Sequence, residues 1–553
     1  MFLRAARLAA PLCFSLLAAA APRTPVILIS IDTLRADHLS AYGYRSLKTP
    51  HLDAFAEHGT LWLHADSQVP LTGPSHACLL TSTYPFENRI EENAEKVPAG
   101  VATLATVLRG QGYATAAFVS SVFLEKEMGF DQGFDFYDSP FHYTVLSALS
   151  GSMFLGDVTQ NPNAGADRRV GALTIRAAEQ WLEAHRDQAA FAFIHLYDLH
   201  KPDRLPPGFN PSPGVTGYDA RLEYEDHVLG SFRAFLEKAG WWKRSIVVLL
   251  ADHGESLGDH GEANHGYFIY ESTLAVPLIM HWPDGAPSMP AEMNRPAGLI
   301  DVAPTILDFL HVAAPASFEG RSLLNPATDH PMYAESLHSH DSFGWAPLRS
   351  VRSGSLKYVE APHPELYDLT ADPGEQRNLF TREPGEAKQL RAQLARLIAR
   401  YPARGSAPAM AMPESTRALL GSLGYVAPGP RARSTGAEPD PKDRLPEFRQ
   451  YEDAMIDAYE GRLSRTIAKL RAIVAADPKN TLARRDLGAF YLERHQYASA
   501  RAELERVAAV ASDDYMTQYE LGIADERVGL LPQALDHLQV ASRLAPDAPQ
   551  CQR

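Results

Sequence analysis

The chain has 553 residues, of which 45% are hydrophobic and 22% are charged, an ordinary composition for a globular protein. This composition excludes a wholly disordered chain, a collagen-like fibre and a protein with many membrane spans. Lys and Arg number 52 against 67 Asp and Glu, so the formal charge of −15 gives no reason to expect a nucleic-acid-binding surface.

Residues 1–21 have the pattern of a secretory leader. Arg4 and Arg7 precede an apolar stretch, and a run of alanines follows it. The apolar stretch is shorter than a typical membrane-spanning helix. We therefore expect a chain that is secreted or periplasmic after cleavage, with an uncleaved N-terminal membrane anchor as the alternative.

Three apolar runs between residues 22 and 400 each lead directly to an aspartate. They are Val26–Ile31 before Asp32, Phe191–Tyr197 before Asp198, and Ile246–Ala251 before Asp252. Such runs alternate with helical patterns, which predicts an α/β domain with a mainly parallel central sheet. Since the carboxyl ends of parallel strands meet at the edge where α/β sheets bind ligands, the three acids should converge there.

Converging carboxylates repel one another unless a cation lies between them. His200, His253 and His265 lie close in sequence to the three acids. A mixed set of Asp and His side chains favours zinc or a similar divalent metal. One aspartate at a strand end could be a helix cap, but three of them accompanied by histidines predict a metal site.

The segment Pro70–Thr81 predicts a nucleophile. Pro74 suits the first turn of a helix, which puts Thr72 at or just before the helix N-terminus. The backbone N–H groups there are expected to favour an anion. A threonine hydroxyl that touches a divalent metal can lose its proton and attack phosphorus or sulfur. The alternative is that Thr72 is only a helix cap.

The C-terminal part of the chain changes character twice. Residues 401–446 are rich in Pro, Gly, Ala and Ser, which predicts a linker. Residues 447–548 are helical and repeat with a period of 34, as in the two Leu-Gly pairs that begin at Leu487 and Leu521. This pattern resembles the tetratricopeptide repeat, with two clear repeats and one weak one. It predicts either a module for a protein partner or self-association, or an appendage packed on the catalytic domain.

Several motifs between residues 24 and 400 together resemble the sulfatase family of the alkaline phosphatase superfamily. They are Ile29–Asp37, Thr72–His76, Thr81–Pro85, Asp252–Glu255, His265-Gly266, Tyr270-Glu271, Asp301–Ile306, Gly320–Leu323 and Glu365–Pro373. The resemblance implies an alkaline-phosphatase-like fold for residues 22–400, and it implies that this domain is catalytic.

The resemblance also implies roles for single residues. Asp32, Asp252 and His253 match metal ligands, and Thr72 matches the nucleophile. Asp198 and His200 match a segment that supplies metal or substrate contacts, and His265 stands where many sulfatases have lysine. Asn93, His76 and Lys201 are weaker candidates for substrate contacts. His195 is interpreted as structural, because it faces the opposite side of its strand from Asp198.

The nucleophile loop departs from the sulfatase pattern. Classical sulfatases carry Cys-x-Pro-Ser-Arg, or Ser in place of Cys, and oxidise the first residue to formylglycine. This chain has Thr-Gly-Pro-Ser-His, and threonine cannot give an aldehyde at Cβ without losing its methyl group. Cys78 lies six residues after Thr72 and lacks the required Pro and Arg. We expect no formylglycine, and the loop is similar to that of nucleotide pyrophosphatase/phosphodiesterases.

The ligand set fits two divalent metals, with zinc expected and Ca, Mn or Mg as alternatives. Asp32, Thr72, Asp252 and His253 would hold one, and Asp198, His200 and His265 the other. This predicts hydrolysis of a phosphodiester or phosphomonoester of a small molecule, glycan or lipid. The alternatives are a sulfuric ester hydrolase, a phospho-group transferase acting on lipid or glycan, and an inactive scaffold that carries a repeat module.

Overall fold

The computed structural model describes residues 23–93, 95–140, 168–200, 205–325, 331–400 and 438–544. The expected leader, Lys201 and most of the expected linker lie outside these ranges, as do Cys13 and Cys551. Within the described ranges, no helix is both long enough and apolar enough to span a bilayer.

An eight-stranded sheet forms the centre of the molecule, in the order β4-β3-β5-β1-β6-β7-β2-β8. Its strands are β1 (Val26–Ile31), β2 (Gly59–Asp66), β3 (Ala114–Phe118), β4 (Phe136–Asp138), β5 (Ala190–Leu196), β6 (Ile246–Ala251), β7 (Ala275–His281) and β8 (Glu292–Gly298). All neighbours pair in parallel except β7, which runs antiparallel to β6 and to β2. The predicted mainly parallel α/β sheet is therefore confirmed.

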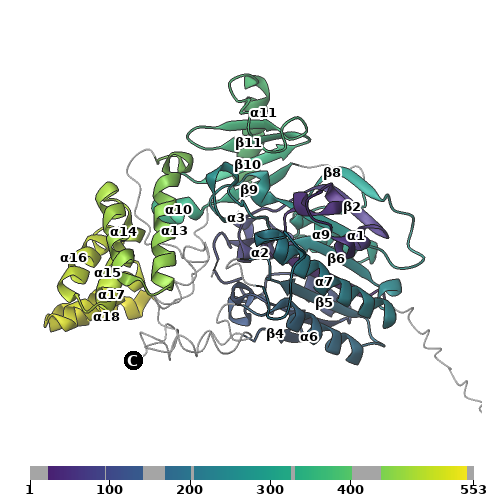
Figure 1. Ribbon diagram of the computed structural model, residues 1–553, viewed down its shortest axis with the longest axis horizontal. Helices are drawn as coiled ribbons and strands as arrows, with labels where there is room; N and C mark the ends of the chain where they lie inside the picture. Colours follow the sequence, from purple (N-terminus) through teal and green to yellow (C-terminus); the bar gives the residue numbers. More distant parts are fainter. Residues whose placement is uncertain are drawn as a thin grey trace, which may run out of the picture.

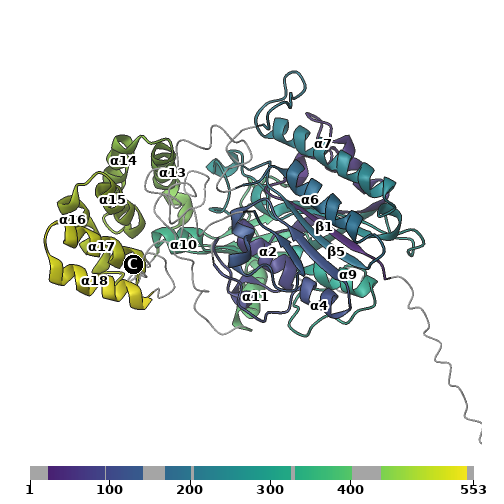
Figure 2. The ribbon, with the colours of Figure 1, turned by 90° about the horizontal axis from the view of Figure 1, so that it is seen from below.

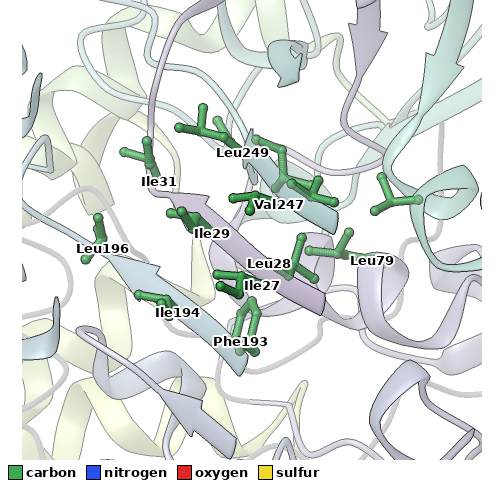
Figure 3. Close-up of a cluster of buried hydrophobic side chains, with 14 of the residues drawn as sticks. Ile27, Leu28, Ile29, Ile31, Leu79, Phe193, Ile194, Leu196, Val247 and Leu249 are labelled. Atoms are coloured by element: carbon green, nitrogen blue, oxygen red, sulfur yellow. The ribbon is translucent and has the colours of Figure 1, made fainter. Parts of the chain in front are cut away.

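The three apolar runs identified in the sequence form β1, β5 and β6, which lie side by side with β1 in the middle. Every residue of these three strands is buried. Figure 3 shows their side chains packed together with a side chain from helix α2, namely Ile27, Leu28, Ile29, Ile31, Phe193, Ile194, Leu196, Val247, Leu249 and Leu79. Each large aliphatic side chain buried in this way stabilises the fold by about 1.5–3 kcal/mol.

Helices cover both faces of the sheet (Figure 2). One face carries α1 (Pro50–Ala56), α6 (Gly171–Ala184) and α7 (Gly217–Lys238), and the other carries α2 (Thr72–Thr81), α4 (Leu104–Gly110) and α9 (Val302–Phe309). Shorter elements in the connections are α3 (Pro85–Asn88), α8 (Glu271–Leu274), η1 (Ala36–His38), η2 (Ser40–Tyr42), η3 (Val122–Leu124), η4 (Lys126–Met128), η5 (Trp242–Arg244), η6 (Asp259–Gly261) and η7 (Leu299–Asp301).

A second, antiparallel sheet follows in the chain, with strand order β12-β11-β10-β9. It consists of β9 (Met332–Ser336), β10 (Leu348–Ser353), β11 (Leu356–Glu360) and β12 (Glu365–Asp368), with α10 (His338–Phe343) after β9 and α11 (Pro384–Ala399) packed against β10 and β11. Buried ion pairs attach this sheet to the central domain: Arg352 of β10 lies 2.9 Å from Asp66 of β2, and Lys357 of β11 lies 2.8 Å from Glu271 of α8.

Three helix pairs complete the described chain (Figure 1). They are α13 (Leu445–Tyr459) with α14 (Leu463–Ala476), α15 (Thr481–Glu493) with α16 (Tyr497–Ala508), and α17 (Tyr515–Arg527) with α18 (Leu531–Leu544). Gly488 and Gly522 occupy equivalent positions, where an added Cβ would lie 2.7 Å from Leu504 and from Leu538 respectively. The repeated glycine therefore allows close approach of paired helices, and the predicted tetratricopeptide pattern is confirmed.

The last residues of the expected linker are packed rather than extended. Residues 438–440 lead into η8 (Pro441–Arg444), and α13 already begins at Leu445. Asp440 is buried and caps η8 by accepting from the backbone N–H of Lys442, while Pro439 O accepts from Ala346 N at 2.9 Å. These contacts attach the start of the helical array to the catalytic region.

Candidate functional site

Thr72 and Asp32 meet at the carboxyl edge of the central sheet. Asp32 directly follows β1, and Thr72 is the first residue of α2. The Thr72 hydroxyl donates a hydrogen bond to Asp32 Oδ2 at 3.0 Å, and both side chains are completely buried. The predicted nucleophile therefore lies directly beside a predicted metal ligand.

Asp252 and His253 follow β6, next to β1, and bring more ligand atoms to the same place. Asp252 Oδ1 accepts from the backbone N–H of Thr33 at 3.3 Å and of His253 at 2.8 Å. His253 Nδ1 lies 2.9 Å from Gly254 O, so it is the protonated nitrogen and donates there. His253 Nε2 is then the unprotonated nitrogen, and it lies 3.5 Å from Asp252 Oδ2.

The outward atoms of this group have the chemistry of a divalent metal site. Asp32 Oδ1, Asp252 Oδ2 and His253 Nε2 are all buried and accept no hydrogen bond from the described residues. Ligand atoms of Asp32, Asp252 and His253 lie within 4.8 Å of one another. Two carboxylates and a neutral imidazole are ligands that suit zinc and similar cations, so these residues fit the metal that the sequence predicts.

Burial sets the protonation states of this group. Burial and the neighbouring Asp32 raise the pKa of Asp252 well above its usual range. Burial lowers the pKa of His253 to about 3, so its ring is neutral at neutral pH. A neutral imidazole is ready to bind a metal, and two adjacent buried carboxylates favour a cation between them.

His195, interpreted from the sequence as structural, lies beside the predicted nucleophile and metal ligands. Its Nε2 lies 3.5 Å from Asp32 Oδ2, and neither of its ring nitrogens has a hydrogen bond within the described chain. Ligand atoms of His76, His195 and Asp252 form a second group within 4.8 Å. His195 does face away from Asp198, but its side of β5 is the one that carries the nucleophile.

His76 is held by both ring nitrogens. Nδ1 lies 2.7 Å from Thr72 O and donates to it, and Nε2 lies 2.9 Å from the Ser30 hydroxyl. Burial lowers the pKa of His76 to about 3. The ring therefore anchors the first turn of α2 to β1, and this geometry favours a supporting role for His76 over the predicted substrate contact.

His265 and His200 lie next to the first group. The His265 ring centroid is 4.4 Å from that of His253 and 5.2 Å from that of His200. His265 Nδ1 lies 3.1 Å from Glu255 Oε1, and Tyr197 stacks on His200 with ring centroids 4.6 Å apart. Three of the predicted histidines are thus brought together.

Asp198 is not brought into this cluster. Its Oδ2 accepts from Gly171 N at 2.7 Å at the start of α6, so close that a Cβ on Gly171 would lie 2.2 Å from it. Burial raises the pKa of Asp198 to about 6, and burial with the Asp198 charge raises the pKa of Glu225 well above its usual range. Asp198 therefore supports the start of α6, which is a different arrangement from the predicted ligand set with His200 and His265.

Asn93 occupies the space beside the nucleophile. Its Oδ1 accepts from Gly73 N at 2.8 Å, and its buried Nδ2 has no hydrogen-bond partner in the part of the chain that the structure describes. Pro74 has no N–H, and Ser75 N donates to Leu71 O at 3.0 Å. The amides after Thr72 are therefore occupied, which corrects the expectation that they face an anion. The predicted contact Lys201 lies outside the described residues.

Family models match most of the chain. A sulfatase model matches residues 24–312, and a model described as N-sulphoglucosamine sulphohydrolase, C-terminal, matches residues 258–401. A tetratricopeptide repeat model matches residues 458–519.

Individual relatives share limited identity over long alignments. The chain is 24% identical to the ulvan-active sulfatase of Formosa agariphila over 407 residues, which cover 66% of this chain and 78% of that protein. It is 23% identical to arylsulfatase K of Mus musculus over 472 residues, covering 70% and 83%. In fold it is similar to the phosphonate monoester hydrolase of Agrobacterium radiobacter, with a TM-score of 0.56, 21% identity and coverage of 69% of this chain and 96% of that one.

Proposed function

This chain belongs to the sulfatase family of ester hydrolases, and within that family we propose that it cleaves phosphate esters with Thr72 as the nucleophile. The observation that carries the proposal is the hydrogen bond from Thr72 Oγ1 to Asp32 Oδ2 inside a buried group of metal-ligand side chains. A threonine at this place keeps its hydroxyl and offers no route to formylglycine.

Cys78, the cysteine nearest to Thr72 in sequence, does not offer another nucleophile. It is completely buried in α2, in a hydrophobic cluster with Tyr84 and Ile300. Burial raises the pKa of the Cys78 thiol far above its usual range, so it stays protonated and unreactive. The proposed nucleophile is therefore the unmodified Thr72 hydroxyl, as in enzymes that form a phospho-threonine or phospho-serine intermediate.

Asp32, Asp252 and His253 would hold one divalent metal, and His200 with His265 would contribute to a second. When bound, such cations neutralise the carboxylates, lower the pKa of the Thr72 hydroxyl and offset charge on the transferred group. A phosphoryl group carries more charge than a sulfuryl group and gains more from this neutralisation. The family generally uses a divalent metal, and zinc is the one that this donor set favours.

The side chains support a two-step displacement. Asp32 Oδ2 takes the proton of Thr72 Oγ1, which forms a bond to phosphorus as the ester P–O bond breaks. The alcohol product leaves with one proton from solvent. Water then attacks the phosphorus of the phospho-threonine and gives up one proton to solvent as the P–Oγ1 bond breaks. Asp32 Oδ2 returns its proton to Thr72 Oγ1, and the phosphate product leaves. We assign Asn93 Nδ2 as a donor to a non-bridging oxygen, because it is buried and has no hydrogen-bond partner in the described residues.

Sulfuric ester hydrolysis is the second candidate. Its support is that the curated relatives named above are sulfatases. In this candidate the Thr72 hydroxyl attacks sulfur instead of phosphorus, with the same side chains around it. The two functions are distinguished by whether the enzyme hydrolyses phosphate esters or sulfate esters faster.

The test compares aryl phosphodiester, aryl phosphate monoester and aryl sulfate on the purified full chain, with its metal content measured. We expect a phosphate ester to react fastest and Thr72→Ala to lose more than about a thousandfold in kcat/KM. Thr83→Ala is the matched control, because Thr83 is a buried threonine whose hydroxyl bonds Thr81 instead of Asp32. Faster hydrolysis of the sulfate favours the second candidate, and an unchanged rate in Thr72→Ala contradicts both.

We also propose that residues 1–21 direct export and are then removed. The basic start and the apolar stretch support this role. Expression with the native N-terminus, followed by N-terminal sequencing of the protein outside the cytoplasm, should find a start near residue 22. A retained Met1 would contradict it.

A further inference from the structure

The first helix of the repeat array packs directly on the catalytic region. In both ribbon views α13 lies beside α10, on the side of the catalytic region that faces the repeats (Figures 1 and 2). Phe448 of α13 is 1% exposed. Its ring stacks on Tyr267 at 4.2 Å between centroids and meets Phe343 edge-on at 5.9 Å. These rings belong to one hydrophobic cluster that spans both parts of the chain.

Polar contacts from the same stretch reach the loop formed by residues 256–268, here named the His265 loop. Arg449 Nε donates to Gly261 O at 2.8 Å. Asn264 Nδ2 donates to Glu452 Oε1 at 2.8 Å, and the Tyr267 hydroxyl donates to Pro441 O at 2.6 Å. The His265 loop is therefore bonded to α13 at two points and to η8, directly before α13, at a third.

The inner side of the His265 loop rests on the nucleophile segment. A Cβ on Gly266 would lie 2.9 Å from Leu71 Cδ2, and Leu71 directly precedes Thr72. Inside the loop, Glu262 Oε1 accepts from Tyr267 N at 2.8 Å and Oε2 accepts from Ser256 Oγ at 3.0 Å. His265 is thus held between α13 on one side and the start of α2 on the other.

The backbone of this loop needs such support. Leu257 and His260 have φ angles of 53° and 51°, and Gly258, Gly261 and Gly266 also have positive φ. Non-glycine residues in the left-handed region cost about 1–3 kcal/mol each and persist only when their surroundings fix them. Glycines here add conformational freedom to the unfolded and partly opened loop.

We infer that α13 is a positioning element of the active site, and that Phe448 and Glu452 hold the His265 loop so that His265 faces His253. His265 and His253 have ring centroids 4.4 Å apart, and small displacements of a side chain in such a group weaken ligand binding and catalysis. The array then acts within its own chain, and the face that carries Phe448 is occupied by the catalytic region instead of being open to a peptide.

The test uses the full chain and two readouts, hydrogen exchange of peptides from residues 256–268 and steady-state kinetics. Phe448→Ala should speed exchange in the His265 loop by about tenfold, since opening the loop no longer breaks the buried stack of Phe448 on Tyr267. It should lower kcat more than it raises KM. Leu521→Ala is the matched control, because Leu521 is equally buried in the array but packs in a separate cluster with Ala500, Leu504 and Ala524.

Milder substitutions at Glu452 and Arg449 distinguish loss of these contacts from simple unfolding of the array. Glu452→Gln keeps an oxygen for Asn264 and should retain the wild-type exchange and kcat, whereas Glu452→Ala should not. Arg449 is exposed, so Arg449→Met should leave the array folded and still speed exchange in the His265 loop.

Wild-type exchange of the His265 loop in Phe448→Ala, Glu452→Ala and Arg449→Met would overturn the inference, as would an equal kcat loss in Leu521→Ala. Exchange is measured without substrate. Failure of this inference is therefore distinguishable from failure of the proposed phosphate ester chemistry.

Discussion

Substituting Asn93 separates two roles that one amide group plays. In the wild type, Asn93 Oδ1 accepts a hydrogen bond from Gly73 N at 2.8 Å. Asn93→Asp keeps an oxygen for this bond but replaces the Nδ2 donor with a second oxygen. Asn93→Ala removes both. If Asn93 Nδ2 donates to a charged oxygen of the substrate, only the aspartate variant loses function without losing the anchor of α2.

The magnitudes follow from burial. Asn93→Ala leaves the buried Gly73 N–H without its acceptor, which costs about 1–3 kcal/mol of unfolding free energy. Asn93→Asp avoids that cost. A hydrogen bond to a charged group contributes about 1.5–3 kcal/mol, so both variants should lose about 10- to 150-fold in kcat/KM.

The assay is thermal unfolding together with kcat/KM on the best phosphate ester from the substrate panel. Asn93→Asp should have a Tm near that of the wild type, and Asn93→Ala a lower one. Wild-type kcat/KM in Asn93→Asp would refute the argument that Nδ2 faces the substrate. Equal stability of both variants would refute the anchoring role of Oδ1.

Three further outcomes are expected. Dialysis against a chelator should abolish hydrolysis and lower the Tm, and adding Zn²⁺ back should restore both; an active protein shown by elemental analysis to lack metal would contradict the site. Burial lowers the pKa of His338, but the Glu92 carboxylate 3.1 Å away outweighs burial and raises it above its usual range. The contribution of this pair to the unfolding free energy should therefore be full below about pH 6.5 and fall by up to about 1.4 kcal/mol per pH unit as pH rises through the raised pKa of His338. The difference between wild type and Glu92→Gln in denaturant titrations should show this slope. Gly488→Ala should overpack the site facing Leu504 at a cost of about 1–3 kcal/mol, so Leu504→Ala should destabilise less in that variant than in the wild type; additive losses in the double-mutant cycle would contradict the close packing.

The sheet and the first ligand group could be predicted because they follow from local rules. The runs before Asp32 and Asp252 match β1 and β6 residue for residue, and parallel neighbours leave both acids at one edge. The helix start at Thr72 follows from Pro74 two residues later. No long-range information was needed for these positions.

His195 and Asp198 could not be placed in the same way. Alternation along β5 correctly sets the two on opposite sides, but both faces of a central strand are buried, so alternation does not say which face carries the nucleophile helix. One signal was available: Ser30, a polar residue inside the apolar β1 run, pairs in register with His195 and bonds His76. The repeat pattern allowed an appendage packed on the catalytic domain, but which residues meet depends on tertiary packing between distant segments, so the contact of α13 with the His265 loop could not be located from the sequence.

The reversed direction of β7 has a consequence for how this active site can change. If β7 were parallel to β6, the chain would have to cross from the carboxyl end of β6 back to the opposite end of the sheet before β7 could begin. Because β7 is antiparallel, it begins at the end of the sheet where β6 finishes. The connection from Asp252 to Leu274 therefore begins and ends at the carboxyl edge that carries Thr72 and Asp32. This one uninterrupted stretch supplies Asp252, His253, Glu255 and His265. Changes in this one connection can therefore alter the ligand side chains of the site while the register of every strand is preserved.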